Sequence, residues 1–156
     1  MPRVKTDKYT QKYYTDLGFH IHKAEKYINI PGQPPRKRDF LNIIDYLVWG
    51  QCTTEDDLGF FSIGEWYTLG IQTTSRSALA PHRNKMLKSA TFPWWTEHPN
   101  HRTFLQGWDL HKNRYRHKTE ELTMKDWTTY QTELEAKNVL DKTSPLYREL
   151  ILGEKV

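Results

Sequence analysis

The chain has 156 residues, the length of one ordinary domain, and carries 23 Lys and Arg against 19 Asp and Glu, a formal net charge of +4. Its single cysteine, Cys52, excludes an internal disulfide framework and a cysteine-built zinc site, and favours a reducing, cytoplasmic setting. The basic first residues lack the apolar segment of a secretory signal, and no apolar run is long enough to span a bilayer. We therefore expect one domain over 1–156 with no membrane association.

The aromatic content is high, with six Trp, nine Tyr and six Phe. Most large aromatic side chains pack in cores and interfaces, and we expect this of Trp94, Trp95, Trp108 and Trp127. Aromatic residues interleaved with basic ones are also typical of proteins that stack on exposed nucleic-acid bases. The small positive charge adds modestly to the case for a polyanionic partner.

The first elements in chain order are a helix and a strand. Residues 6–16 have apolar side chains at helical spacing, and Gly18 is suited to follow the end of that helix. Residues 19–30 are rich in Ile, Phe and Tyr, which predicts a strand. Residues 31–38 hold three prolines, which predicts a loop.

The middle of the chain alternates strand and helix patterns. The second half of 38–50 predicts a buried strand and its first half a helical turn, and 65–75 predicts another strand. Residues 77–89 have helical spacing, in which Pro81 is tolerated only in the first turn. Pro93 is expected to end that element.

Two elements complete the chain. Residues 102–116 predict a single strand, and Thr123 with Asp126 resembles a capping pattern that opens a helix through Ala136. The order helix, three strands, helix, strand, helix predicts an α/β domain in which a mixed central sheet is flanked by helices.

Polar residues interrupt the apolar strands at two places. Asp45 lies inside an apolar run, where a carboxylate is costly to bury unless a cation or hydrogen bonds satisfy it. Side chains alternate along a strand, so Gln72 and Thr74 share one face. If the two strands form a hairpin, Asp45 and Gln72 converge, and Glu25 from the preceding strand would add a third oxygen ligand of the kind that Mg²⁺ prefers.

These residues resemble the PD-(D/E)XK nuclease superfamily. Its pattern is an acid before the second strand, an acid-x-lysine pair on the next strand, and then a helix. RDFLNIIDYL places Asp45 as the hallmark aspartate, and GIQTTS places Gln72 and Thr74 at the acid and lysine positions. The chain looks most like phage and bacterial proteins with a Gln-x-Thr-Ser strand followed by a basic helix.

The resemblance covers about 6–112 and has implications for fold and activity. It implies a restriction-endonuclease-like αβββαβ core, followed here by a helical extension over about 119–140. It also implies a DNA endonuclease that hydrolyses phosphodiester bonds with Mg²⁺, or with Mn²⁺ in its place. In the implied site, the metal ligands are Glu25, Asp45 and Gln72.

Two departures from the family pattern affect the chemistry. Gln72 is neutral where the family has a carboxylate, and Thr74 replaces the lysine that would orient the attacking water and stabilise the phosphate. Lys85 on the basic helix is the first candidate to replace that lysine, with Arg83 and Lys88 as alternatives. If none does, the chain is a catalytically degenerate nuclease fold that binds nucleic acid or a protein partner. A third hypothesis is a small phage-type accessory protein whose polar strand face is incidental.

Other roles remain open for the acidic residues. Asp45 could instead cap a strand or pair with Arg38. We interpret Asp39 as an N-cap of the turn at Phe40 rather than as a second acid of the site.

Basic residues near the candidate site are expected to meet DNA phosphates. These are Arg36, Lys37 and Arg38 in the loop, and Arg83 and Lys88 on the helix, where His82 is also interpreted as a backbone contact. Small nucleases that cut both strands commonly work as dimers, and the C-terminal helix with Trp127 and Leu134 is the predicted homodimer interface.

Overall fold

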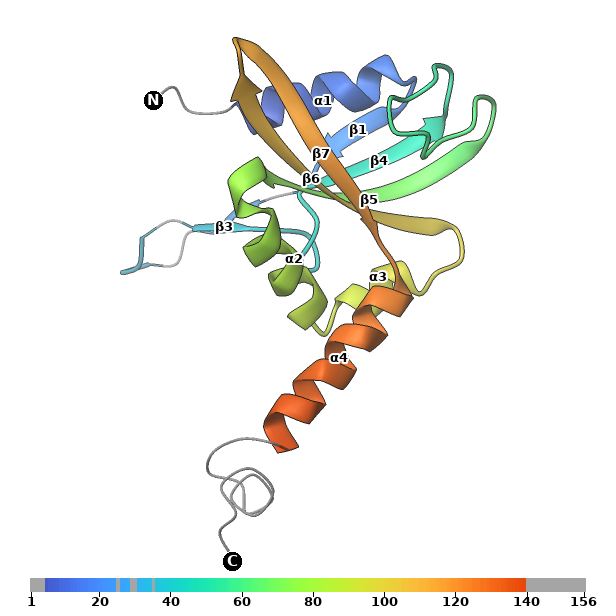
Figure 1. Cartoon of the computed structure of the whole chain (residues 1–156). Coiled ribbons are helices and arrows are strands. Elements are labelled where there is room, and N and C mark those ends of the chain that lie inside the picture. Colours follow the sequence, from blue (N-terminus) through green and yellow to red (C-terminus); the bar gives the residue numbers. More distant parts are fainter. Residues whose placement is uncertain (1–4, 25, 29–30, 35, 140–156) are drawn as a thin grey trace, which may run out of the picture.

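The structure, a computed structural model, describes residues 5–24, 26–28, 31–34 and 36–139. It has an α/β fold in which a five-stranded mixed sheet is flanked by helices (Figure 1). The sheet order is β1-β4-β5-β6-β7, and β2 and β3 form a separate two-stranded sheet. The elements are α1 (Thr6–Asp16), β1 (His20–Lys23), β2 (Lys26–Ile28), β3 (Arg36–Arg38), β4 (Tyr46–Gln51), β5 (Trp66–Ser75), the 3₁₀ turn η1 (Arg76–Ala78), α2 (Leu79–Lys88), α3 (Phe92–Thr96), β6 (His101–His111), β7 (Arg114–Leu122) and α4 (Met124–Val139).

The main sheet combines antiparallel and parallel pairs. β1, β4 and β5 form an antiparallel meander in which Ile21 lies opposite Val48 and Val48 opposite Leu69. The chain then crosses over through α2 and α3, so that β6 runs parallel to β5 with Ile71 beside Phe104. β7 returns antiparallel to β6. The predicted mixed sheet flanked by helices is confirmed.

Helix α1 covers one face of this sheet. Its Tyr14 packs with Tyr46 and Ile71 in a buried cluster. The helix has the predicted bounds and ends as predicted at Gly18, whose φ of +100° favours glycine. The N–H of Gly18 donates to Thr15 O and the N–H of Phe19 to Tyr14 O, which is a Schellman motif.

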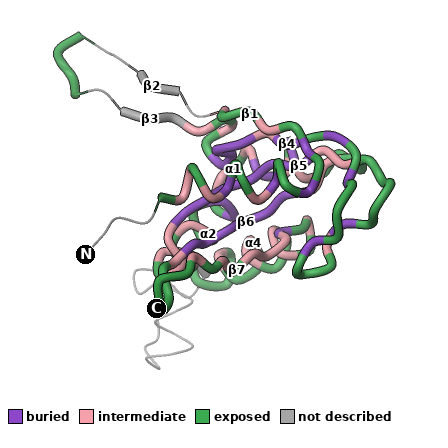
Figure 2. The backbone as a smooth tube through the Cα atoms, turned by 90° about the horizontal axis from the view of Figure 1, so that it is seen from above, coloured by how far each residue is buried: buried purple, intermediate pink, exposed green. Residues whose placement is uncertain are grey.

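Helices α2, α3 and α4 cover the opposite face. Their side chains form a second buried cluster with the sheet, which includes Ile44, Met86, Phe92, Leu105 and Leu122. Figure 2 shows the buried residues running along β6 and its neighbouring strands, between the two layers of helix. No helix in the described part of the chain is long and apolar enough to cross a membrane.

Three local predictions in the first half of the chain are wrong. The segment 19–30 holds two strands, β1 and β2, instead of one. The expected loop over 31–38 contains strand β3, which pairs with β2. The expected helical turn near residue 40 is a tight left-handed turn, because Leu41 and Asn42 have φ of 53° and 64° and the chain reverses into a bridge between Phe40 and Ile44.

Two further predictions fail after α2. Pro93 does not end an element but lies in the first turn of α3, where its missing N–H costs nothing. The single strand expected over 102–116 is a hairpin of β6 and β7. Lys112 and Asn113, with φ of 49° and 63°, form its two-residue turn, and such a turn needs positive φ at both positions.

The C-terminal helix begins later than the expected extension at 119. Residues 119–122 complete β7, and α4 follows. The predicted cap is confirmed, since Asp126 Oδ2 accepts from the N–H of Thr123 at 2.8 Å. Trp127 packs against the core under α2 and α3, whereas Trp94 is 71% exposed and lies outside the core.

Candidate active site

Asp45 lies immediately before β4, where β5 continues past the end of its neighbour. β4 begins at Tyr46, opposite Ile71, and β5 extends four residues further, to Ser75. The N–H of Asp45 donates to Ile71 O at 2.8 Å, and its Oδ2 accepts from the N–H of Thr73 at 2.9 Å. The residue is only 7% exposed. Its carboxylate therefore satisfies a backbone donor that β4 does not reach, and it is fixed in place by β5.

Asp45 and Gln72 lie where the pairing of β4 with β5 ends. Tyr46 and Ile71 form the last pair of the β4–β5 ladder and pack in the buried cluster under α1, whereas Ile44 packs in the opposite cluster. Because the N–H of Asp45 also donates to Ile71 O, the regular alternation of faces stops at Asp45. On β5, Gly70 shares a face with Gln72 and lies against Ile44 and Trp95 of the second buried cluster. The hairpin brings Asp45 close to β5 beside Gln72, because Asp45 accepts from the N–H of Thr73, and the convergence of the two side chains stays a prediction.

The amide of Gln72 is 3% exposed and has one unpaired atom. Its Nε2 lies 3.4 Å from Nδ1 of His82 on α2. Its Oε1 is buried and has no hydrogen-bond partner in the described part of the chain. A buried acceptor without a partner costs about 1–3 kcal/mol, so this oxygen is available for a ligand.

A second glutamine gives a useful comparison. Gln106 on β6 is also buried with an unpaired Oε1. It lies beside Thr73 and opposite Thr119, on the α1 face of the sheet. No carboxylate is in register with it. The two buried glutamines therefore differ in the sheet face that they occupy, and Gln72 is the one that meets α2.

Helix α2 adds two side chains one turn apart. His82 contacts Gln72, and Lys85 Nζ lies 3.5 Å from Asp39 Oδ2. Burial, and then the charge of Lys85, lowers the pKa of His82 below its usual 6.5, while Asp39 opposes them. His82 is therefore neutral near pH 7, which lets its Nδ1 accept from the Gln72 amide.

We call these five residues the site cluster: Asp39, Asp45, Gln72, His82 and Lys85. Thr74 lies on the same face of β5 as Gln72 and is also buried. Its hydroxyl is short and neutral, so it cannot supply the positive charge of the family's strand lysine.

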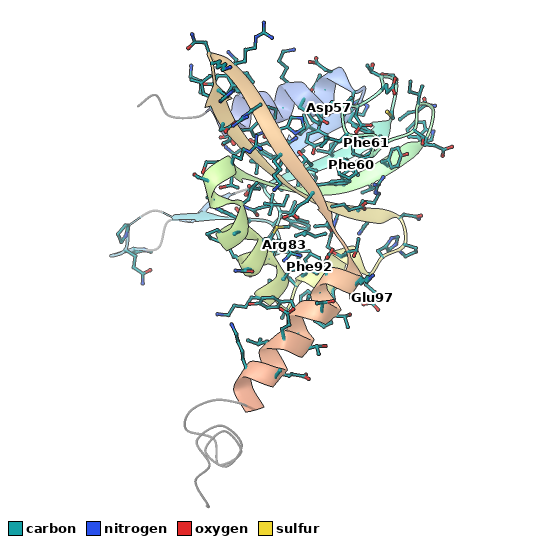
Figure 3. The ribbon with its side chains drawn as sticks, in the orientation of Figure 1. Asp57, Phe60, Phe61, Arg83, Phe92 and Glu97 are labelled. Atoms are coloured by element: carbon teal, nitrogen blue, oxygen red, sulfur yellow. The ribbon has the colours of Figure 1, made fainter. Side chains whose placement is uncertain are left out.

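The structure does not bring the other candidate residues to the cluster. Arg83 pairs with Glu120 at 3.6 Å and with Asp126 at 3.5 Å, on the side of α2 that faces β7 and α4 (Figure 3). Lys88 is exposed at the end of α2 and makes no ion pair with any described residue.

The basic candidates Arg36, Lys37 and Arg38 lie on β3, which Figure 1 shows to the side of α2 and away from the main sheet. Glu25 lies outside the described residues. The alternative ion pair of Asp45 with Arg38 involves a side chain outside the described part of the structure.

The oxygen donors of the cluster suit Mg²⁺ better than a softer metal. Within the described residues, no group of three or more His, Cys, Asp or Glu is placed to hold a metal ion. Mg²⁺ is commonly bound through only one or two carboxylates, with waters and phosphate oxygens as its other ligands. The carboxylate of Asp45 and the unpaired Oε1 of Gln72 fit that pattern.

Two members of the cluster were not assigned to the site from the sequence. The side chain of Asp39 does not cap the turn at Phe40 but pairs with Lys85. His82 contacts Gln72, and its expected contact with the DNA backbone stays a prediction. The spacing of His82 and Lys85 puts them on neighbouring positions of a helix face, but only the crossover of α2 decides which part of the sheet that face meets.

In comparisons with known proteins, no protein-family model matches this chain, and neither a curated protein nor a solved structure matches it.

Proposed function

We propose that this chain is a Mg²⁺-dependent DNA endonuclease with a restriction-endonuclease-like core. The observation that carries the proposal is the buried, unpaired Oε1 of Gln72, which lies under His82 of α2 and next to Thr73, the residue that the buried Asp45 carboxylate binds. The element order supports it. Helix α1, strands β1, β4 and β5, helix α2 and strand β6 follow the αβββαβ order, with β2 and β3 inserted between the first and second strands.

Each residue of the cluster has a role in this proposal. Asp45 and Gln72 hold the metal ion, with Glu25 as the expected third ligand. The ion held there would supply charge to neutralise a phosphate oxygen and to lower the pKa of a water. His82 holds the amide nitrogen of Gln72, which keeps Oε1 turned toward the ligand.

Lys85 provides the positive charge that Thr74 lacks. Its ammonium group stabilises the negative charge that develops on the phosphate during hydrolysis. The ion pair with Asp39 restricts where that group can lie. Because Lys85 is 57% exposed, its flexible stem can move from Asp39 to a bound phosphate.

The experiment is plasmid cleavage in Mg²⁺, in Mn²⁺ and in EDTA. We expect nicked and linear DNA with either metal and intact plasmid in EDTA. Thr74→Lys, tested in parallel, separates the nuclease from the degenerate alternative. A wild type that binds DNA but cuts it with neither metal, while Thr74→Lys cuts, would establish a degenerate nuclease used for binding.

A further inference from the structure

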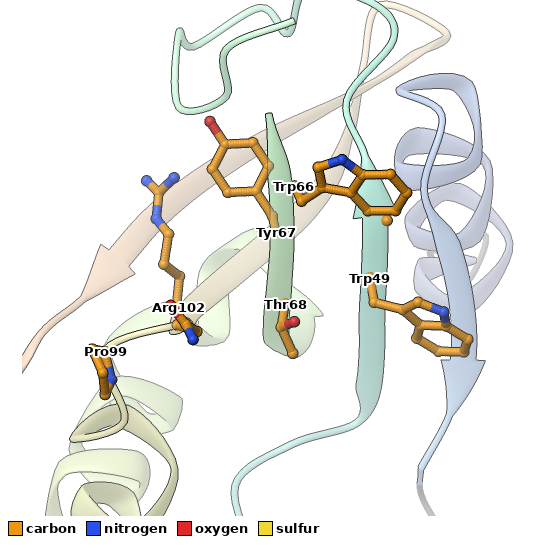
Figure 4. A pocket seen from close by; sticks show the side chains of 8 residues that line it. Trp49, Trp66, Tyr67, Thr68, Pro99 and Arg102 are labelled. Carbon is orange, nitrogen blue, oxygen red and sulfur yellow. The ribbon is translucent and has the colours of Figure 1, made fainter. Parts of the chain in front are cut away.

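A surface pocket of about 520 Å³ lies at the other end of the sheet from the site cluster (Figure 4). It is formed by the end of β4, the start of β5 and the start of β6. The residues that matter here are Trp49, Trp66, Thr68, Asn100 and Arg102. Ligand pockets in proteins commonly measure about 300–1,000 Å³, so this one can hold a flat ring.

Two tryptophans expose their rings in this pocket. Trp66 is 74% exposed and Trp49 is 44% exposed. Gln51 pairs with Trp66 and Trp49 with Thr68, so the two tryptophans are diagonal neighbours on the same face of the hairpin. Figure 4 shows the indole of Trp66 extending from β5 toward β4, and the indole of Trp49 on the other side of β4, toward β1.

The indole of Trp49 stacks on a neighbouring side chain, whereas the indole of Trp66 stacks on none in the described part of the chain. Trp49 stacks on His20 of β1, with ring centroids 5.8 Å apart and an interplanar angle of 29°. Trp66 makes no ring contact with any described residue. Exposed tryptophans that gather around a hollow mark binding sites more often than isolated ones do.

The pocket shares its sheet face with the site cluster. Trp66 and Gln72 are six positions apart on β5, and Trp49 and Asp45 are four apart, which corresponds to roughly 20 Å and roughly 13 Å along the strands. Trp95 packs on Gly70 between them, so the pocket is a separate surface. A polymer held in the site cluster can reach it.

The polar groups of the pocket favour a ring over a phosphate. The guanidinium of Arg102 is held by both carboxylate oxygens of Glu121 and by Phe60 O, so its charge is already compensated. Thr68 and Asn100 leave neutral donors and acceptors beside the indoles. This combination suits a nucleobase, which has flat apolar faces and polar edges.

We propose that Trp49 and Trp66 form a stacking site for unpaired nucleotide bases, so that the preferred substrate is DNA with a single-stranded segment. The identity of the polymer rests on the proposed nuclease function. The two rings hold bases of the strand that flanks the cut.

The test is the affinity of a labelled oligothymidylate, measured by fluorescence anisotropy in EDTA, where no cleavage occurs. Trp49→Ala and Trp66→Ala should each weaken binding by about 5-fold to 100-fold, the scale of one lost stacking contact. Trp94→Ala is the matched control, because Trp94 is similarly exposed but does not line the pocket. Trp66→Tyr should restore part of the affinity.

A second oligonucleotide distinguishes binding to the bases from binding to the sugar-phosphate backbone. An abasic strand of equal length should bind the wild type as weakly as the double alanine variant binds oligothymidylate. Equal affinity of wild type and double variant for oligothymidylate would overturn the proposal. A second result would also overturn it: the wild type is a dimer in sedimentation, and Trp66→Ala makes it a monomer without changing oligonucleotide binding. The two tryptophans would then form an interface between copies of the chain.

These outcomes are independent of cleavage. If the wild type cuts no DNA, but substitution of the tryptophans removes its base-dependent binding, the nuclease proposal fails and the stacking site stands. If the wild type cuts DNA and substitution of the tryptophans has no effect on binding, the stacking site fails and the nuclease proposal stands.

Discussion

Asp45 is both a structural acceptor and a candidate metal ligand. Its Oδ2 accepts from the backbone of Thr73, so removing the whole side chain would leave a buried donor unpaired. Asp45→Asn keeps an acceptor oxygen while removing the charge. This substitution therefore separates the chemistry of the site from the stability of the strand.

The neutral side chain at Gln72 allows a test of the metal that needs no substrate. Gln72→Glu places a second carboxylate beside Asp45 in a buried setting, so we expect a lower melting temperature in EDTA. Adding Mg²⁺ should stabilise this variant more than it stabilises the wild type, because binding to the folded state raises its stability. Thermal unfolding with and without Mg²⁺ measures both effects.

Gln106→Glu is the control for that experiment. It also buries a new carboxylate on the sheet, but on the α1 face. We expect it to be destabilised to the same extent with and without Mg²⁺. Equal responses of the two variants to Mg²⁺ would contradict the assignment of Gln72 as a ligand.

Lys85 is predicted to replace the strand lysine. Lys85→Met should reduce the cleavage rate by about 100-fold, the scale for losing a main electrostatic element of a site. Lys88→Met, one turn further on α2, should leave cleavage close to wild type. Thr74→Lys combined with Lys85→Met should recover part of the rate, because only the origin of the charge changes. Cleavage rates in gel assays test this prediction. A wild-type rate in Lys85→Met would show that Lys85 does not take the place of the strand lysine.

At the scale of elements, sequence patterns worked where the interactions are local. The bounds of α1, its end at Gly18 and the cap of α4 follow from contacts within a few residues. The hairpin of β2 and β3 was missed because prolines mark its turn while its strands are only three residues long. The turn at Lys112 and Asn113 was missed because it has no glycine.

The candidate site was predictable in part for the same reason. Asp45 directly precedes β4 and Gln72 lies on the adjacent antiparallel strand β5, so the hairpin brings this stretch of backbone together. His82 and Asp39 approach this pair only through the crossover of α2 and the left-handed turn before β4. Those placements depend on tertiary packing, and no local pattern encodes them.

The conformation of Gly18 at the end of α1 predicts that a side chain there is destabilising. Gly18→Ala forces a side chain into a backbone with φ of +100° and against the side chain of Thr53. We expect a loss of about 2 kcal/mol or more in the free energy of unfolding in urea. Gly59→Ala also has positive φ, 74°, but meets nothing within 4 Å, so it should cost less. Equal losses would mean that the contact with Thr53 contributes nothing.

At the scale of the whole molecule, the basic strand β3 ends at Arg38, one residue before Asp39 of the site cluster. Replacing Arg36, Lys37 and Arg38 with Gln should lower the slope of log affinity against log salt by about two to three units, if all three meet phosphates. The same change at Lys112, Arg114 and Lys118, in the hairpin of β6 and β7, should leave the slope unchanged. Titrations of duplex DNA at several salt concentrations measure both, and the opposite pattern would place the DNA on the β6–β7 hairpin.

The most direct test of the account compares two buried aspartates. Asp56 is as buried as Asp45 and also accepts from backbone N–H groups, those of Phe60 and Phe61, but it lies outside the site cluster (Figure 3 labels both phenylalanines). In Mg²⁺, Asp45→Asn should reduce plasmid cleavage by at least about 100-fold, while Asp56→Asn should cut at a rate close to wild type. Wild-type cleavage by Asp45→Asn, or an equal loss in both variants, would contradict a nuclease site at Asp45.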